Sequence, residues 1–167
     1  MALNVSRKFL ITMLVLYVGE VFLLGQGVIA AMAVLVGVFI LLMGAWSMLR
    51  RNREKAKARG RTAFVLIGTA LLALASISVN NALAEKRCRR LIADCEQYHA
   101  KYNKYPDRLE QLVPEFISSV PLAKYTMQFN DFSYMSSPER HTIMYVAFPP
   151  FGRPYYVFET HRWGYLD

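Results

Sequence analysis

Five side chains in the second half of the chain are able to support acid–base, thiol or metal chemistry: Cys88, Cys95, His99, His141 and His161. Cys88 and Cys95 lie seven positions apart on a segment with helical periodicity, so their Cα atoms are expected about 10.5 Å apart. A disulfide requires Cα atoms within about 7 Å of each other. Each thiol is therefore predicted to be either shielded inside the protein or paired with another chain.

The pattern of these side chains does not build a catalytic or metal site. Cys95 and His99 have the i, i+4 spacing that lets one helix offer two metal ligands, but no CxxC or HExxH pattern supplies the others. The sequence also lacks a GxSxG elbow, a P-loop and a dinucleotide-binding fingerprint. We therefore predict a protein without enzymatic activity, cofactor or bound metal.

The net charge of +8 belongs almost entirely to the first half of the chain. Residues 1–84 hold nine Lys and Arg against Glu20 and Glu54, a net charge of +7, while residues 85–167 hold eleven against ten Asp and Glu, a net charge of +1. A nucleic-acid-binding domain carries a basic patch or stripe, which the second half lacks. Nucleic acid is therefore not expected as a partner.

Three apolar runs, at about 9–24, 28–49 and 63–84, predict three transmembrane helices within a membrane region at 1–84, because a helix crosses the hydrocarbon core with about 17–25 residues. Arg7 and Lys8 precede the first run as in a signal peptide, but no small-residue cleavage site follows it. We therefore expect the first run to stay in the protein, in contact with the lipid bilayer.

The loops between these runs predict the orientation. The "GQG" link is uncharged, whereas the loop at 50–62 holds seven Lys or Arg and one Glu. Short basic loops stay in the cytoplasm. We therefore expect a multi-pass protein of the bacterial inner membrane, with a cytoplasmic N-terminus and a periplasmic domain at 85–167.

Three polar side chains lie within the predicted spans: Glu20 near the outer end of the first, and Asn80 and Asn81 at a similar depth in the third. A carboxyl inside a membrane often marks an ion path. The alternative is that Glu20 faces the headgroups or hydrogen-bonds an asparagine of a neighbouring span. Small residues four positions apart favour close helix packing; they are Gly27 with Ala31 and Ala33 with Gly37.

Residues 85–103 predict an amphipathic helix that continues the third apolar run without a break. Its less polar face is formed at steps of three and four by Cys88, Leu91, Ile92, Cys95, Tyr98 and Tyr102. The helix should stop before Pro106, because the residue that precedes a proline avoids the helical region. A short turn is expected next, capped by Asp107 with Glu110 as its capping-box partner. Tyr105, Pro106, Asp107, Leu109 and Leu112 would form a structural joint, with both leucines folded back onto the helix.

The segment after Pro121 changes to strand-like composition. Aromatic and β-branched runs, "YTMQF", "FSYMS", "HTIMYVAF", "PYYVFET" and "WGYLD", are separated by "SPER", "PPFG" and "HRWG". They predict an antiparallel meander of three or four strands. The fold class is thus a membrane α-helical region followed by a small α+β domain, in which the long helix packs on the sheet.

Residues 63–167 resemble a type IV pilin or a type II secretion pseudopilin. The resemblance is carried by the long helix at 63–103, the Tyr105-Pro106 stop, the turn with Leu109 and Leu112, and the stretch "PPFGRPYYVF" at 149–158. Pilins carry a Glu at the fifth position after their cleavage site, but Gly60 is followed by Arg61, Thr62, Ala63, Phe64 and Val65. The resemblance therefore implies a pilin-like head on a permanent membrane anchor.

Two kinds of function follow from these features. The first is a non-enzymatic assembly protein whose head meets partners in a cell-envelope machine related to type II secretion or type IV pili. The second is an accessory subunit of a respiratory or transport complex, bound through its transmembrane helices. Exposed apolar side chains on the head would favour the first, and exposed small or polar side chains on the spans the second. Both allow oligomers and require other membrane or envelope proteins as partners.

Overall fold

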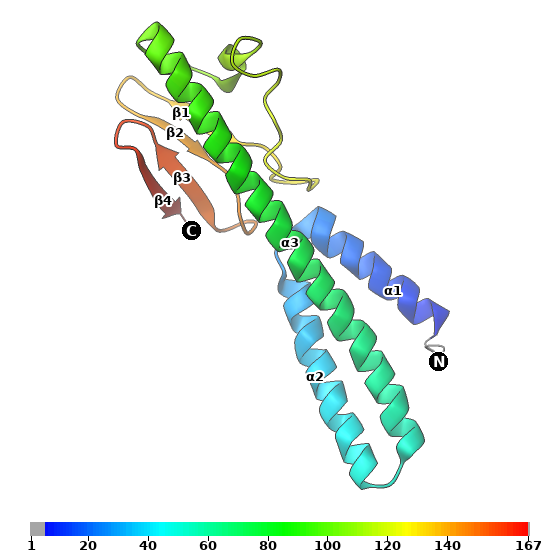
Figure 1. Ribbon diagram of the computed structural model, residues 1–167. Coiled ribbons are helices and arrows are strands. Elements are labelled where there is room, and N and C mark those ends of the chain that lie inside the picture. The colour runs from blue at the N-terminus through cyan, green and yellow to red at the C-terminus, as the bar shows by residue number, and fades with distance from the viewer. Residues whose placement is uncertain (1–5, 167) are drawn as a thin grey trace. The chain divides into compact units, whose positions relative to one another are not determined.

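The computed structural model describes residues 6–166 and divides the chain into two compact units, Met1–Ser78 and Val79–Asp167 (Figure 1). The boundary lies inside one long helix, α3 (Arg53–Tyr102), which contributes to both units. The long helix predicted from the sequence is thus confirmed, although it begins ten positions before Ala63. The unit boundary is also earlier than the predicted one at residue 84.

The first unit contains α1 (Arg7–Val18), a π-helical turn η1 (Gly19–Leu24), α2 (Val28–Leu49) and the beginning of α3. Among the described residues, two helices are long and apolar enough to cross a membrane, α2 and α3. The prediction of three such helices is wrong in this respect. The run at 9–24 is divided between α1, with 12 residues, and η1, with 6 residues, so neither part reaches the length of a span by itself.

The segment at 50–62, predicted as a basic loop, is mostly helical. The loop is confined to Arg50, Arg51 and Asn52, and Arg51 adopts a left-handed conformation with φ of 56°. Asn52 then caps α3, since its Oδ1 accepts a hydrogen bond from the Lys55 N–H at 3.2 Å. The residues that follow are mostly Lys, Arg, Glu and Ala, which favour helix, so α3 starts directly after the cap.

Small residues line the contact between α2 and α3. The buried residues of α2 are Ala30, Gly37, Gly44 and Ser47, and those of α3 in this unit are Ala63, Leu66, Ala70, Ala73 and Ile77. A Cβ atom at Gly37 would lie 2.5 Å from Ile67 Cγ1, so only glycine fits there without displacement of Ile67. Of the small residue pairs found in the sequence, Gly27 and Gly37 are buried, whereas Ala33 is half-buried and Ala31 is exposed.

The second unit packs the end of α3 against a four-stranded sheet (Figure 1). The strands β1 (Ser133–Ser136), β2 (His141–Met144), β3 (Arg153–Val157) and β4 (Arg162–Leu166) are antiparallel and follow the order of the chain. The predicted meander is therefore confirmed. The "YTMQF" run is not a strand. It lies in a loop in which the Ala123 N–H donates to Asn130 O at 2.6 Å.

One hydrophobic core joins α3 to the inner face of the sheet. Its fully buried centre contains Cys88, Cys95, Leu112, Ile143 and Phe158. Alternation along the strands places Ile143 opposite Tyr156 in this face. Large aromatic side chains bury enough apolar area to give this small domain a hydrophobic core. The helix–sheet packing predicted from the periodicity of 85–103 is thus present.

Candidate functional site

The segment after α3 folds back onto the core, as its sequence predicted. Asn103 ends the helix in a left-handed conformation with φ of 55°, and Pro106 is fully buried. Leu109 and Leu112, in the 3₁₀ turn η2 (Leu109–Leu112), are both buried in the core cluster. The Tyr134 hydroxyl donates to Pro106 O at 2.8 Å. The joint is therefore attached to both the helix and the sheet.

The capping arrangement differs from the predicted one. The Asp107 N–H donates to Gln111 Oε1 at 2.8 Å, and Gln111 Nε2 donates to Asp107 Oδ2 at 3.3 Å. No side chain caps η2 at Arg108, its N-cap residue. The partner of Asp107 is thus Gln111, not Glu110, because η2 begins at Leu109 with Arg108 as its N-cap residue, one position later than the predicted cap at Asp107.

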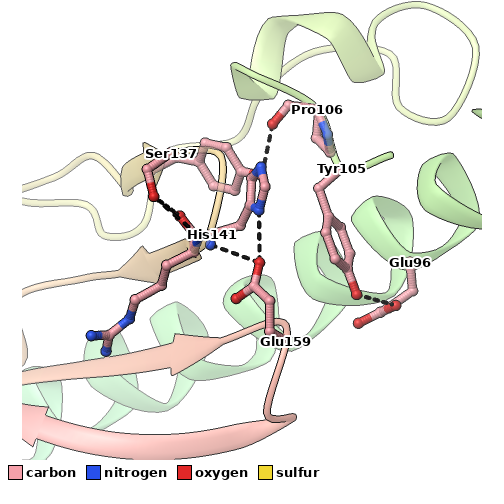
Figure 2. Close-up of polar contacts among 8 residues, drawn as sticks. Glu96, Tyr105, Pro106, Ser137, His141 and Glu159 are labelled. Atoms are coloured by element: carbon pink, nitrogen blue, oxygen red, sulfur yellow. Dashed lines mark hydrogen bonds and ion pairs between the residues drawn. The ribbon is translucent and has the colours of Figure 1, made fainter. Parts of the chain in front are cut away.

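All three histidines of the chain lie around this joint, and Figure 2 shows one of them, His141, together with Tyr105 and Glu96. The Tyr105 ring stacks on His99 with ring centres 4.2 Å apart, and lies 5.2 Å from the ring of His141. The Tyr105 hydroxyl donates to Glu96 Oε2 at 3.1 Å. His161 Nδ1 lies 3.5 Å from Glu96 Oε1. The cluster therefore connects α3, the joint and the sheet through polar contacts.

The strongest polar pair of this cluster is formed by His141 and Glu159. Glu159 Oε1 accepts from the His141 backbone N–H at 2.9 Å and lies 2.7 Å from His141 Nδ1. Burial raises the pKa of Glu159, but the hydrogen bonds from His141 outweigh it, so this pKa lies below its ordinary value. No serine, threonine or cysteine of residues 6–166 is hydrogen-bonded to this pair. Nothing in its geometry activates a nucleophile, and the cluster holds the joint in place.

The two cysteines are buried in the core and unpaired. Cys88 and Cys95 are 0 % exposed, and both thiols are free. Burial raises the pKa of each thiol to about 12. An interchain disulfide, one of the two alternatives left by the sequence, would require this core to open. Across residues 6–166, no three of the His, Cys, Asp and Glu side chains are grouped to hold a metal ion.

The outer face of the sheet, which points away from α3, carries several apolar side chains beside the polar residues Ser133, Thr142, Arg153 and Arg162. An antiparallel sheet with one buried face normally presents polar side chains on the other. Here the register places Met144 beside Tyr155, and Met135 beside Thr142 and Val157, on the outer face. Leu166 lies at the end of the same face and is exposed. We call this surface the outer sheet face.

Two adjoining hollows are cut into the outer sheet face. The first has a volume of about 480 Å³ and is lined by the apolar or aromatic side chains of Met135, Met144, Tyr155 and Leu166 and by the polar residues Ser136, Ser137, Arg140 and Thr142. The second has a volume of about 470 Å³ and shares Arg140 and Tyr155 with the first. Its other lining residues are Glu139, Val157, Glu159, Thr160, Arg162 and Trp163. Apolar side chains interspersed with charged ones are found on surfaces that bind another protein.

A glycine shapes the floor between these hollows. A Cβ atom at Gly164 would lie 2.3 Å from Tyr155 Cζ and 2.4 Å from its hydroxyl oxygen. The Tyr155 ring therefore lies directly over the Gly164 backbone. A larger residue would force the ring away and change the shape of the outer sheet face. The sequence contained a signal for this face, since "HTIM" and "RPYYV" place apolar side chains at both alternations.

The polar side chains predicted inside the spans are found in different units. Glu20 lies in η1, is 2 % exposed, and lacks a hydrogen-bond partner for either carboxyl oxygen among the described residues. Asn80 belongs to the second unit, where its Oδ1 accepts from the Tyr125 N–H at 3.0 Å. The Oδ1 atom of Asn81 is buried and lacks a partner within residues 6–166. Asn80 thus fixes a loop, whereas the role of Glu20 is left open by its contacts.

Comparisons with protein-family models, curated proteins and solved structures found no match.

Proposed function

We propose that this protein is a membrane-anchored, non-enzymatic assembly protein whose head binds a partner protein through the outer sheet face. The head is the second unit, Val79–Asp167, and α2 with the first part of α3 forms the anchor. The pilin-like order of helix, joint and meander supports a place in a cell-envelope machine related to type II secretion or type IV pili.

The observation that carries this proposal is the pair of hollows on the outer sheet face. The apolar side chains Met135 and Leu166 are exposed there, at 51 % and 47 %. Because a solvated sheet face gains nothing from such residues, their presence favours contact with another protein. The charges of Glu139, Arg140 and Arg162 at the rim would then select the partner by electrostatic complementarity.

The anchor offers less support for an accessory subunit that binds through its spans. The side chains that α2 exposes are mostly large and apolar, among them Leu35, Phe39 and Leu42, which suit lipid. Both glycines of α2, Gly37 and Gly44, are buried and are therefore not free to receive a partner helix, and its exposed small residues are two separate alanines, Ala31 and Ala45.

Photo-crosslinking in native membranes tests the proposed surface. A photoreactive amino acid at Met135 should crosslink to one discrete envelope protein. The control position is Tyr102, which is exposed to a similar degree, 44 %, but lies on α3. Met135→Glu together with Leu166→Glu should weaken co-purification of that partner at least tenfold while the melting temperature stays the same. Crosslinks from Leu72 in α3 and none from Met135 would favour the accessory-subunit alternative.

The proposed orientation has its own test. The basic stretch from Arg50 to Arg61 should hold the turn between α2 and α3 in the cytoplasm, and the head should be periplasmic. A reporter fused after Asp167 should be active only if it functions outside the cytoplasm. Activity of a cytoplasm-specific reporter at that position would reverse the orientation.

A further inference from the structure

The loop at 122–130 carries an apolar surface that the proposed function does not use. Met127 is 72 % exposed and Tyr125 is 58 % exposed, and the large side chains of Leu122 and Phe129 are exposed as well. Residues 125–130, "YTMQFN", include no charged side chain. A cluster of exposed apolar side chains marks contact with another protein or with a membrane. The place at which this loop meets α3 decides between these two partners.

The loop is attached to α3 at two positions on one face of the helix. Asn80 Oδ1 accepts a hydrogen bond from the Tyr125 N–H at 3.0 Å. Seven positions later, Arg87 Nη1 donates to Leu122 O at 2.7 Å, and Arg87 Nη2 donates to the Tyr125 hydroxyl. The Arg87 guanidinium also lies over the Tyr125 ring, 4.5 Å from its centre. The loop is therefore held against α3 between Asn80 and Arg87.

This part of α3 contains the end of its apolar run. The helix is long and apolar enough to cross a membrane, and the run ends at Ala84. Asn80 lies about 6 Å before Ala84 along the helix axis, and residues 86–90 lie about 3–9 Å after it. Because a bilayer has a hydrocarbon core of about 30 Å and a total thickness of about 40–45 Å, each headgroup layer is about 5–8 Å deep. With Ala84 at the boundary of the core, the loop is attached at the edge of the hydrocarbon and residues 86–90 lie among the headgroups.

One face of α3 changes from apolar to basic at the same boundary. Val79, Leu83, Lys86 and Arg90 follow one another at steps of four, three and four, so their side chains lie in one stripe along the helix. Val79 is 70 % exposed, and both basic residues are exposed. Within residues 6–166, neither Lys86 nor Arg90 forms an ion pair. These two cations are therefore available to an anion outside the chain.

The order of these side chains matches a membrane interface. Tyrosine is enriched at the level of the headgroups, and Lys and Arg near a membrane surface are attracted to anionic lipids. A protein partner would not require the change from apolar to basic to coincide with the end of a span. Arg87 is engaged with the loop, and Arg89 pairs with Glu85 at 2.8 Å, so Lys86 and Arg90 are the residues of this segment that are left for a lipid phosphate.

We propose that the loop at 122–130, together with Lys86 and Arg90, is a membrane-contact surface of the head that binds anionic phospholipid. Tyr125, Met127 and Phe129 enter the boundary of the hydrocarbon, and the two cations bind headgroup phosphates. The contact attaches the base of the head to the bilayer beyond the span itself. This inference rests on the membrane location of α3 in the proposed function, but not on partner binding by the outer sheet face or on the side of the membrane that carries the head.

Fluorescence quenching of the full-length protein in lipid nanodiscs tests the lipid contact. A thiol-reactive fluorophore is attached at Met127→Cys, while Cys88 and Cys95, which are 0 % exposed, stay unlabelled in the folded chain. Lipids with a nitroxide near the top of the acyl chain should quench this fluorophore at least twofold more than one at Lys104→Cys. Lys104 is exposed and follows the end of α3, about 33 Å along the helix from Asn80. A fluorophore at Leu72→Cys, inside the span, should be quenched as well.

The same fluorophore at position 127 measures the preference for anionic lipid. Phosphatidylglycerol that carries a nitroxide should quench it at least twofold more than phosphatidylcholine with the same label at the same mole fraction, because each basic side chain near an anionic surface strengthens the attraction about fivefold. Lys86→Gln together with Arg90→Gln should bring the ratio of the two quenching values close to one. Lys104→Gln together with Arg108→Gln removes the same charge from exposed positions beyond α3 and should leave the ratio unchanged.

The possible failures can be told apart. Quenching at Leu72→Cys without quenching at Met127→Cys would overturn the membrane-contact surface and leave the anchor intact, whereas the absence of quenching at both positions would refute the membrane location itself. A ratio near one with both cations present, or a high ratio that survives in Lys86→Gln with Arg90→Gln, would overturn the binding of anionic lipid. A photoreactive amino acid at Met127 that crosslinks to one discrete protein in native membranes, and not to lipid, would also overturn the proposal.

Discussion

Leu112→Ala should destabilise the head far more than Asp107→Ala, although the two residues lie five positions apart in the same joint. Leu112 is 0 % exposed and belongs to the core cluster between α3 and the sheet. Its truncation leaves a cavity in that core, which costs about 2–5 kcal/mol. Asp107 is exposed, and its truncation removes only the 3.3 Å hydrogen bond from Gln111 Nε2, which is worth about 1 kcal/mol or less.

These free energies translate into separable melting temperatures. For a domain of this size each kcal/mol shifts the midpoint by about 4–8 °C. A central value of about 3 kcal/mol for Leu112→Ala then predicts a decrease of roughly 12–24 °C. Because a small domain has a total stability of about 5–15 kcal/mol, the variant should also become sensitive to protease at temperatures that the wild type tolerates.

The assay follows Trp163, which belongs to the sheet, during thermal unfolding of the full chain in detergent. The chain has two tryptophans, so Trp46→Phe serves as the background and leaves Trp163 as the sole reporter. Leu112→Met, which keeps the volume, is the control and should cost less than about 1.5 kcal/mol. If Leu112→Ala melts within a few degrees of the background while Asp107→Ala abolishes crosslinking from Met135, the joint is a binding surface and not part of the core.

Three further predictions concern a buried amine, a helix contact and the thiols. Lys124 is 2 % exposed, its Nζ donates to Ala147 O at 2.6 Å, and burial lowers its pKa to about 8 from an ordinary value of 10.5. Between these two pH values the unfolded chain binds more protons than the folded chain. The stability of the wild type relative to Lys124→Met should therefore rise with pH across this window, by about 1.4 kcal/mol per pH unit at most. Equal pH profiles for the two proteins in denaturant titrations would contradict this. Gly37→Leu should weaken the packing of α2 on α3 and lower the free energy of unfolding in detergent by about 1–3 kcal/mol. Gly68→Leu is the control and should be tolerated, because a Cβ atom at Gly68 meets open space. Equal destabilisation by the two variants would show that Gly37 does not lie in the helix contact. Cys88 and Cys95 should resist maleimide labelling in the folded chain and react fully in denaturant, and labelling of the native protein within minutes would show that the core is open.

The elements with one strong period could be predicted from the sequence. Steps of three and four from Cys88 to Tyr102 identified the helix face that the core covers, and the proline at 106 marked its end within a few residues. The strands of the meander were recognisable because aromatic and β-branched runs alternate with turn sequences. In each case local preference and tertiary packing favour the same structure.

The features that sequence analysis missed depend on contacts between distant residues or on backbone irregularity. A run of apolar residues at 9–24 has the composition of a span, but composition does not reveal that the helix changes to a π-turn at Gly19. The capping partner of Asp107 depended on the residue at which the turn begins, which is one position later than predicted and shifts the partner by one residue. The outer sheet face was missed because rings such as Tyr155 look like core until the register assigns them to a side.

The topology of the head has a consequence for the order in which its parts form. Each strand pairs with the next along the chain, so the sheet can assemble from local contacts alone, but the helix it covers is made much earlier. Until the strands pack on the helix, Cys88 and Cys95 are exposed to solvent, where a thiol has its ordinary reactivity. Their protection in the folded state is therefore acquired late. If the head lies in an oxidising compartment, as proposed, a longer interval between synthesis of the helix and closure of the sheet exposes more chains to mixed disulfides, and a pulse of thiol reagent during synthesis would measure that interval.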